Sequence, residues 1–491
     1  MREPGHNTSR IVLKNATSQT GGRWFLTVAR FGIAALIVRH AGVERFGEYS
    51  IVLSLLFLAE LAVDFGMTDI IVNAICQQPE RLRALTKAMS AAKGMQAVVG
   101  VLVLVVVLLV MGYPKHVINS GLVAAVSLPL FAGILVYRAV FRVRMIMGRE
   151  VLAEVLGVLV MIPLVWLACI RNSGLEVLVA CHVVSRVVFL LASAMMAPAT
   201  SLNPVGALRS DVGWALKTSA PLGFTGVLMS AYLVMDPVML EKINGMRIVG
   251  QFSIAMRFIT PVLLLVQAVV TAVYPVLASL WQRNPARFRK TLQVSLDVAI
   301  LVGGAALCLF QCGANGMTAV MGGGTKEAAD ALRLLAWGIL PRAISTTISS
   351  LFVISNHLRP LLWLSILAVV VKGFLLLLLA PVHGASGAAI AFVTTEYAVG
   401  LLPLLFLAHR MFALPIRWNV LARVAVVSAI VIGASRITGI QGSLRGCLLA
   451  CVLYPSLVVA TRVVTAKQLR QLTFGPPDGS FKSRPQPPPL P

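Results

Sequence analysis

The chain has 491 residues, of which 58% are hydrophobic and only 12% are charged. Because a soluble domain carries about 25% charged residues, this composition excludes a soluble enzyme or binding module and predicts a polytopic membrane protein. A formal net charge of +24 would indicate nucleic-acid binding in a soluble protein. Most of the basic residues lie between apolar segments instead, so we expect no nucleic-acid partner.

The elements predicted in chain order are almost all membrane-spanning helices. Residues 1–22 are polar and lack the apolar core of a cleaved signal peptide, so we expect a cytoplasmic N-terminal segment. Apolar segments long enough to cross a bilayer, which takes about 20 residues, then follow. We expect spans at residues 23–40, 48–72, 91–112, 117–138, 150–170, 175–197, 214–238, 250–277, 291–312, 330–353, 361–381, 385–408, 419–435 and 444–463. The predicted fold class is therefore an all-α polytopic membrane protein with about 14 transmembrane helices.

The basic residues between the spans predict the orientation of the chain. With the N-terminus inside, 27 Lys and Arg residues fall on the cytoplasmic side and 10 on the opposite side. This bias is a positive-inside signal, and it depends on the span count because losing one span would exchange the sides for everything after it. Both termini are therefore expected in the cytoplasm. The Pro-rich tail at 474–491 has no apolar residues to bury and is expected to be disordered.

A short internal repeat predicts two helical bundles. Residues Gly42–Ile51 join the first two spans, and residues Gly245–Ile254, 203 positions later, join spans seven and eight. Both copies place two glycines, an aromatic residue and a Ser-Ile pair in register. Transporters are often built from such halves, with the substrate site between them. We expect a first six-helix bundle at 23–197, a second at 214–408, and two additional helices at 419–463.

The chain lacks the sequence motifs of common enzymes. It contains no nucleotide-binding P-loop, no His-Glu-x-x-His and no Gly-x-Ser-x-Gly, and no loop is long enough to hold a catalytic domain. The seven cysteines lie in apolar runs without further ligands nearby, which favours packing over a metal site. We therefore predict that the protein is not an enzyme and has no catalytic residues, no bound metal and no cofactor.

Charged residues inside the spans are the candidates for function. Five of them lie about 15–20 Å from the nearer span end, close to the membrane midplane where a charge is costly unless paired or hydrated. These are Arg186, Arg257, Arg342, Lys372 and Glu396. Four cations against one anion cannot be neutralised by internal pairing, so we expect a net-positive cavity for a large anion, gripped by arginine. The alternative is that these side chains only cross-link helices or reach the membrane surface.

Two further charges lie at similar depth in the first two spans. Arg30 is about 10 Å and Asp64 about 12 Å from the cytoplasmic ends of their helices. Because the helices run antiparallel, we predict an ion pair or a shared polar site. The substrate-binding candidates are thus Arg30, Arg186, Arg257, Arg342 and Lys372, and the candidates for gating or coupling are Asp64, Asp236 and Glu396.

Several short motifs, taken together in their order, resemble those of a known family. They are Arg30 in the first span, Gly42 to Ser50 in the first turn, Asp64-Phe65-Gly66 closing the second span, Gly250 to Ser253, and Gly324 to Leu340. They are similar to the Wzx-type polysaccharide and O-antigen flippases of the multidrug/oligosaccharidyl-lipid/polysaccharide exporter superfamily. The resemblance extends over about residues 10–465. Fourteen spans and a Pro-rich tail depart from the usual pattern of twelve spans, and fourteen spans also fit the lipid II flippase relatives.

This resemblance implies a protein of the bacterial inner membrane. It would carry an undecaprenyl-pyrophosphate-linked oligosaccharide from the cytoplasmic to the periplasmic leaflet by alternating access, for exopolysaccharide or O-antigen synthesis. Its partners would be this anionic cargo and membrane lipid, with a polysaccharide polymerase or chain-length regulator as a candidate. Three alternatives stay open: a drug or cation antiporter of the same superfamily, a membrane-embedded polysaccharide polymerase or ligase, and a non-transporting scaffold.

Overall fold

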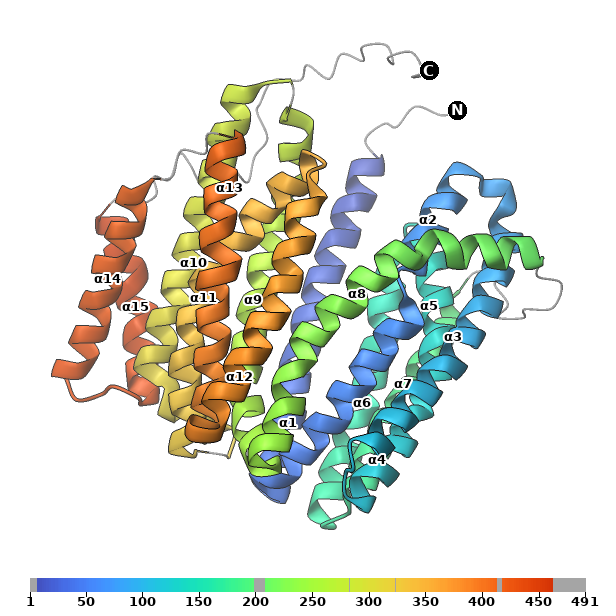
Figure 1. The fold of residues 1–491 in the computed structure, drawn as a ribbon, viewed down its shortest axis with the longest axis horizontal. Coiled ribbons are helices and arrows are strands. Elements are labelled where there is room, and N and C mark those ends of the chain that lie inside the picture. The colour runs from blue at the N-terminus through green and yellow to red at the C-terminus, as the bar shows by residue number, and fades with distance from the viewer. Residues whose placement is uncertain (1–6, 198–207, 282, 323, 413–416, 462–491) are drawn as a thin grey trace.

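The computed structural model consists of helices and loops, without strands, in the residues that it describes, which are 7–197, 208–281, 283–322, 324–412 and 417–461 (Figure 1). Helices are the expected solution in lipid, because every backbone group must find its hydrogen-bond partner within the chain. The helices are α1 (Asn7–Asp64), α2 (Met67–Gln77), α3 (Leu82–Val110), α4 (Lys115–Ala125), α5 (Ser127–Val143), α6 (Met147–Ile170), α7 (Leu175–Met196), α8 (Arg209–Asn244), α9 (Met246–Leu280), α10 (Pro285–Val320), α11 (Lys326–Ile354), α12 (Leu358–Thr395), α13 (Leu402–Phe412), α14 (Trp418–Ile437) and α15 (Leu444–Ala460). A 3-10 turn, η1 (Pro79–Arg81), precedes α3, and a π-helical segment, η2 (Glu396–Leu401), joins α12 to α13.

The predicted fold class, an all-helical polytopic membrane protein, is confirmed. Within the described residues, 11 segments are long and apolar enough to cross a membrane. Two of them have 57 and 55 residues and are each interrupted by a glycine with non-helical backbone angles, Gly42 in α1 and Gly384 in α12. The last helix, α15, is shorter, with 17 residues. The count of fourteen spans stays a prediction.

The two ends of the chain differ from the simplest expectation. Helix α1 begins at Asn7, so most of the polar segment before residue 23 is part of a helix. This extension continues the first span without a break, because residues 7–22 contain no proline to interrupt the helix. The predicted disorder of residues 474–491 falls outside the described residues.

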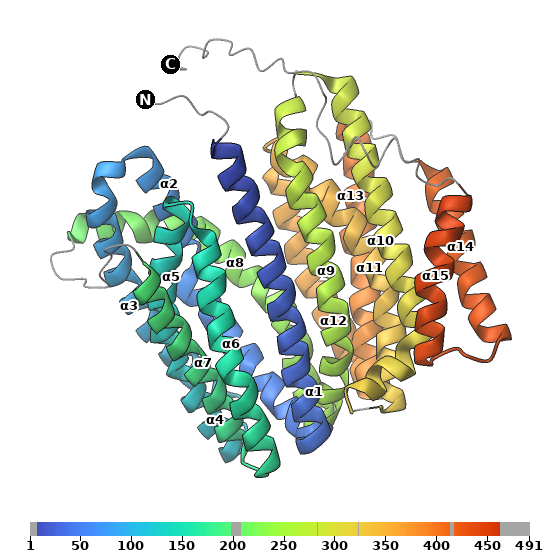
Figure 2. The same cartoon turned by 180° about the vertical axis from the view of Figure 1, so that it is seen from behind.

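The helices form two bundles that meet at one end (Figures 1 and 2). Helices α1 to α7 make the first bundle, and α8 to α13 make the second. Helices α14 and α15 pack against α10 on the outer side of the second bundle. In both views the bundles come together at the end opposite to the start of α1 and lie further apart at the end where α1 starts. The bounds expected for the two bundles and the two additional helices, 23–197, 214–408 and 419–463, stay a prediction.

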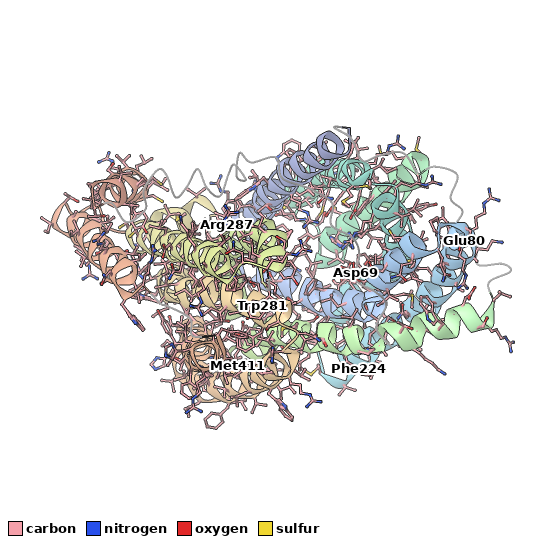
Figure 3. All side chains as sticks on the ribbon, turned by 90° about the horizontal axis from the view of Figure 1, so that it is seen from above. Asp69, Glu80, Phe224, Trp281, Arg287 and Met411 are labelled. Carbon is pink, nitrogen blue, oxygen red and sulfur yellow. The ribbon has the colours of Figure 1, made fainter. Side chains whose placement is uncertain are left out.

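Helices α1 and α8 connect the two bundles. Helix α1 contacts α6 of its own bundle and also α8 and α9 of the other. Helix α8 contacts α2 and α3 of the first bundle and α12 of the second, and Figure 3 shows it extending from one bundle along the other. Arg81 binds Asp211 at 2.6 Å, and the ring of Phe65 packs against that of Phe224 with centroids 5.4 Å apart. The N-terminal half of α8 therefore packs against the first bundle, while the helix continues into the second.

The sequence repeat has the same backbone conformation in both copies. Gly42 has φ 88° and ψ 169°, and Gly245 has φ 83° and ψ 175°, so each reverses the chain with angles that favour glycine. The second glycines of the repeat, Gly47 and Gly250, lie where the bundles touch. A Cβ atom on Gly47 would overlap the carbonyl oxygen of Met246, and one on Gly250 would overlap that of Val43. The two contacts are equivalent under the repeat, so the bundles close on each other backbone to backbone.

The buried apolar residues hold the bundles together at this closed end. One cluster runs through both bundles and includes Phe46, Tyr49, Val249 and Phe252, which are all less than 3% exposed. A separate cluster in the second bundle lies around Phe288 and includes the α13 residues Leu404 and Ala408. A third joins α10 to α14 and α15 through Cys308 and Cys312, which pack there as small apolar side chains.

Candidate functional site

A cavity of about 430 Å³ lies between the two bundles. Its walls come from α1, α8 and α9, the helices that join the bundles. This volume is in the range of pockets that bind small ligands or parts of larger ones. The polar residues in its wall are Thr27, Arg30, Ser50, Ser54, Asp236, Ser253, Arg257 and Thr260.

The cavity is lined by equivalent positions of the two repeats. Residues separated by the repeat offset of 203 face it in pairs, among them Ser50 with Ser253, and Ser54 with Arg257. The offset also pairs Arg30 with Leu233. The wall is thus symmetric in position and asymmetric in chemistry, because neither arginine has an arginine as its counterpart.

Arg257 is the cavity cation that has no carboxylate partner among the described residues. Its guanidinium carbon lies 5.8 Å from the centre of the Phe46 ring, a cation–π contact with a residue of the other bundle. Such a contact orients the guanidinium without neutralising its charge. The side chain therefore retains hydrogen-bond donors and a positive charge for an anion in the cavity.

Arg30 does not pair with Asp64, so that prediction is wrong. Its Nη2 donates to Oε1 of Glu154 on α6 at 2.5 Å, while Asp64 binds Lys93 of α3 at 3.2 Å and accepts from Thr68 at 2.6 Å. Similar predicted depth does not decide which side chains meet, because it leaves open which neighbouring helix each side chain faces. Arg30 keeps an exposed fraction of 53% and lines the cavity.

The other three predicted substrate-binding cations lie inside the bundles, each paired with a carboxylate. Arg186 binds Glu60 at 2.6 Å, Arg342 binds Glu396 at 3.0 Å, and Lys372 binds Asp236 at 2.7 Å. The expectation that internal pairing could not neutralise these charges is wrong for all three. Glu60 on α1 reaches Arg186, and Asp236 on α8 reaches Lys372, from other helices of the structure.

The three gating or coupling candidates all accept from a cation. Lys372, at 1% exposure, donates to Asp236 and to the backbone carbonyl of Tyr232 at 2.9 Å. Lys93, also at 1% exposure, donates to Asp64 and to the carbonyl of Val63 at 2.8 Å, so it also binds the last turn of α1. Their function in gating or coupling stays a proposal.

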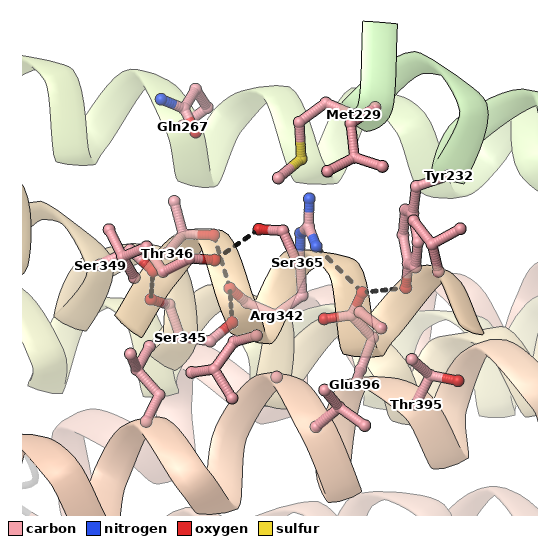
Figure 4. Close-up of a pocket in the computed structure, with 18 residues that line it drawn as sticks. Met229, Tyr232, Gln267, Arg342, Ser345, Thr346, Ser349, Ser365, Thr395 and Glu396 are labelled. Carbon is pink, nitrogen blue, oxygen red and sulfur yellow. Dashed lines mark hydrogen bonds and ion pairs between the residues drawn. The ribbon is translucent and has the colours of Figure 1, made fainter. Parts of the chain in front are cut away.

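A second cavity of about 260 Å³ lies within the second bundle, among α8, α9, α11, α12 and η2 (Figure 4). Figure 4 shows Arg342 and Tyr232 both pointing at Glu396, whose Oε1 accepts from the guanidinium and, at 2.8 Å, from the Tyr232 hydroxyl. Ser345 and Thr346 donate their hydroxyl protons to the carbonyl of Arg342 in the preceding turn. Their oxygen lone pairs remain for water or a ligand in the cavity. The described residues contain no group of three or more His, Cys, Asp or Glu side chains suited to a metal ion.

Sequence reasoning missed the acidic and basic partners of these charges. Lys93 is one of the 27 basic residues that the sequence assigns to the cytoplasmic side, but α3 begins at Leu82, so Lys93 lies about three turns inside a helix. Glu154 lies in a predicted span and was not connected to Arg30. A carboxylate and a cation at similar depth in different spans weakly indicate an ion pair. They do not identify which helices are neighbours.

Comparison with known proteins shows related folds at low sequence identity. The lipid II flippase MurJ in an inward closed conformation matches with a TM-score of 0.69 and 15% identity, covering 90% of this chain and 98% of that one. An inward-facing multidrug resistance MATE family transporter of the MOP superfamily matches with a TM-score of 0.64 and 17% identity, covering 78% and 94%. A MOP superfamily transporter from Pyrococcus furiosus, described as having a binding pocket of reverse polarity, matches with a TM-score of 0.57 and 15% identity, covering 82% and 96%.

A search of curated proteins found no match. At these identities the structural similarity shows a shared fold, that of polytopic flippases and transporters. The family model described as "Polysaccharide biosynthesis protein" matches residues 12–281, which is more than half of the chain. The protein therefore belongs to the family of polysaccharide biosynthesis proteins.

Proposed function

We propose that the protein carries a lipid-linked anionic oligosaccharide, of the undecaprenyl-pyrophosphate type, from the cytoplasmic to the periplasmic leaflet of the bacterial inner membrane by alternating access. The observation that carries this proposal is the position of Arg257, a cation without a carboxylate partner in the described chain, in the cavity between the bundles. A diphosphate supplies the missing negative charge, and a guanidinium binds phosphoryl oxygens with two parallel hydrogen bonds.

The surrounding structure supports the same proposal. Arg30 lines the cavity from α1 of the first bundle and Arg257 from α9 of the second, so an anion between them contacts both halves. The family match to polysaccharide biosynthesis proteins agrees with a glycan cargo. The distribution of basic residues favours a cytoplasmic N-terminus, and with it a cytoplasmic position for the wider end between the bundles, where α1 starts. A polymerase or chain-length regulator is the proposed partner for the delivered glycan.

The runner-up is a drug or cation antiporter, which the MATE-like fold favours. A cationic substrate requires carboxylates in the cavity. Asp236 is the carboxylate in that wall, and Lys372 already neutralises it at 2.7 Å. The balance of charge in the cavity therefore favours an anionic cargo.

We propose Glu396 as the coupling carboxylate among the three candidates, because it lies at the wall of the second cavity and accepts from both Arg342 and Tyr232. Protonation of this carboxylate would release both donors and loosen α11 from η2. The Glu396→Gln variant is expected to transport with a rate independent of a proton gradient, measured in proteoliposomes. An unchanged gradient dependence would contradict this assignment.

Complementation tests the transport proposal. Arg257→Gln is compared with Arg289→Gln, an exposed arginine at the start of α10, in a host lacking its own flippase and at matched expression. Because Arg257→Gln removes a charge-assisted hydrogen bond to the cargo, we expect this variant to lose surface polysaccharide by about tenfold or more. Lipid-linked repeat units should accumulate in the cytoplasmic leaflet. The Arg289→Gln variant should lose no surface polysaccharide.

Two outcomes would contradict the proposal. Normal polysaccharide in the Arg257→Gln strain would show that the cavity does not bind the anion through this residue. Repeat units that reach the periplasmic leaflet without being polymerised would point to a membrane-embedded polymerase instead.

A further inference from the structure

Two buried hydrogen-bond acceptors without partners line the cavity between the bundles. Ser50 on α1 is 7% exposed and Asp236 on α8 is 3% exposed. Neither Ser50 Oγ nor Asp236 Oδ1 has a hydrogen-bond partner among the described residues. A buried polar atom without a partner is destabilising, so the few that native proteins keep call for an explanation such as a bound ligand or water.

These two atoms are distinguished by where they lie. Among all buried side-chain oxygen and nitrogen atoms without a partner in the described chain, they are the ones whose residues line either of the two cavities. They also come from different bundles, as do the two cavity arginines. Each bundle therefore supplies the cavity with one cation and one acceptor that is not in use.

The Asp236 carboxylate is held in a fixed position. Its Oδ2 accepts from Lys372 Nζ at 2.7 Å, and the same ammonium donates to the carbonyl of Tyr232 at 2.9 Å. With one oxygen fixed in this way, the other cannot rotate away to find a partner elsewhere. Oδ1 is thus a preorganised acceptor in a region of low dielectric constant, where a hydrogen bond to a charged group is strong.

We propose that Ser50 and Asp236 form a subsite that accepts hydrogen bonds from the sugar attached to the diphosphate of the cargo. Arginine only donates and an ionised carboxylate only accepts, so the cavity requires a ligand with phosphoryl oxygens on one side and hydroxyl or amide N–H donors on the other. A glycosyl diphosphate has both. A bare polyprenyl diphosphate binds the arginines but has no proton for Asp236 Oδ1 to accept, so the subsite distinguishes loaded carrier lipid from empty carrier lipid. This inference rests on the proposed function.

The test is a comparison of two probes on the purified full-length protein in nanodiscs. The probes are a short-chain polyprenyl diphosphate and the same lipid carrying one N-acetylglucosamine, and the affinity of each is measured by calorimetry. The wild-type protein is expected to prefer the sugar-bearing probe by about tenfold or more, the effect of a hydrogen bond to a charged group. Ser50→Ala should lower that preference by about threefold or more.

Two further variants complete the experiment. Asp236→Leu combined with Lys372→Met removes both members of the buried pair and should abolish the preference, while keeping the protein interior neutral. Ser193→Ala is the matched control, because Ser193 is a serine at 1% exposure whose hydroxyl also lacks a partner in the described chain and which lies outside both cavities. It should retain the full preference.

The outcomes separate this inference from the function on which it rests. Equal affinity of the wild-type protein for both probes, or a preference that Ser50→Ala leaves intact, would overturn the subsite while the anion site stands. If Arg257→Gln weakens neither probe, the anion site itself is wrong and the proposed function fails with it. A preference lost in Ser50→Ala and kept in Ser193→Ala supports the subsite even if the Asp236 variant does not fold.

Discussion

The two bundles share a backbone design and differ in their charges. Gly42 and Gly245 reverse the chain with the same φ and ψ, within a few degrees, and Gly47 and Gly250 make reciprocal contacts across the interface. The side chains at equivalent positions have diverged. The cavity arginine Arg257 corresponds to Ser54, and Glu48, which binds His116 at 2.8 Å, corresponds to Gln251, whose amide lies 3.4 Å from Glu327.

This difference shows which features must be symmetric and which need not be. A joint that closes two bundles on each other needs matching backbone surfaces, so the glycines occur in both copies. A ligand such as a glycosyl diphosphate is itself asymmetric, so the cavity wall gains nothing from symmetric charges. Charges inside each bundle follow a third rule, since a buried ion must be paired locally whatever the other bundle contains.

The largest expected effect comes from breaking the most deeply buried pair. Lys372 and Asp236 are 1% and 4% exposed at their side chains, whereas Arg186 and Glu60 in the first bundle are 17% and 10% exposed. Lys372→Met leaves a buried carboxylate unpaired and should destabilise the protein by about 3–5 kcal/mol. Arg186→Met should cost less, about 1.5–3 kcal/mol, because Glu60 keeps more contact with water.

Thermal unfolding of the purified variants in the same detergent measures which of the two substitutions destabilises the protein more. Adding Asp236→Leu to Lys372→Met should recover most of the lost stability, since the uncompensated charge is then removed. An equal loss for the two single variants, or no recovery in the double variant, would show that the bundles do not differ in how they hold their buried charges.

The next effect concerns the symmetric joint. Gly47→Val and Gly250→Val each place a side chain against a backbone carbonyl of the other bundle, which should disfavour the closed contact by about 1–3 kcal/mol. Both should open the end at which the bundles meet, opposite to the start of α1. Labelling of a Ser253→Cys reporter in the cavity, in a background without the native cysteines, by an impermeant thiol reagent from that side should rise about tenfold.

Gly433→Val on α14 is the matched control, because a Cβ there meets no atom within 4 Å. It should leave the labelling unchanged. If only one of Gly47→Val and Gly250→Val raises the labelling, the contact is not functionally symmetric and the comparison between the bundles fails at this point.

The architecture was predictable from the sequence because it follows from local patterns. Apolar length predicts helices that cross the membrane, and a ten-residue repeat predicts two related bundles. The structure adds that the repeat glycines are the joint itself. Helix α8 departs from the simple picture, because its N-terminal half packs against α2 and α3 of the first bundle, and no periodicity in the sequence indicates such a crossing.

The candidate site was only partly predictable, for a geometric reason. Position along a span predicts the depth of a charge, and Arg257, singled out in this way, lines the cavity between the bundles. Depth does not determine which neighbouring helix a side chain faces, so the partners of Arg186, Arg342 and Lys372 were missed. The same limitation produced the wrong pairing of Arg30 with Asp64.

The smallest expected effect on stability distinguishes the cavity from the bundle interiors. Arg30 and Glu154 form a short ion pair, but the arginine side chain is 53% exposed, so solvent screens the attraction and the pair contributes about 0–1 kcal/mol. Glu154→Gln should therefore unfold at nearly the wild-type temperature. It should also release Arg30 into the cavity and strengthen binding of a bare polyprenyl diphosphate by about threefold, measured by the same calorimetry. A large loss of stability in Glu154→Gln would show that Arg30 is a structural charge of the first bundle. Arg257 would then be the cavity cation that remains to bind an anion.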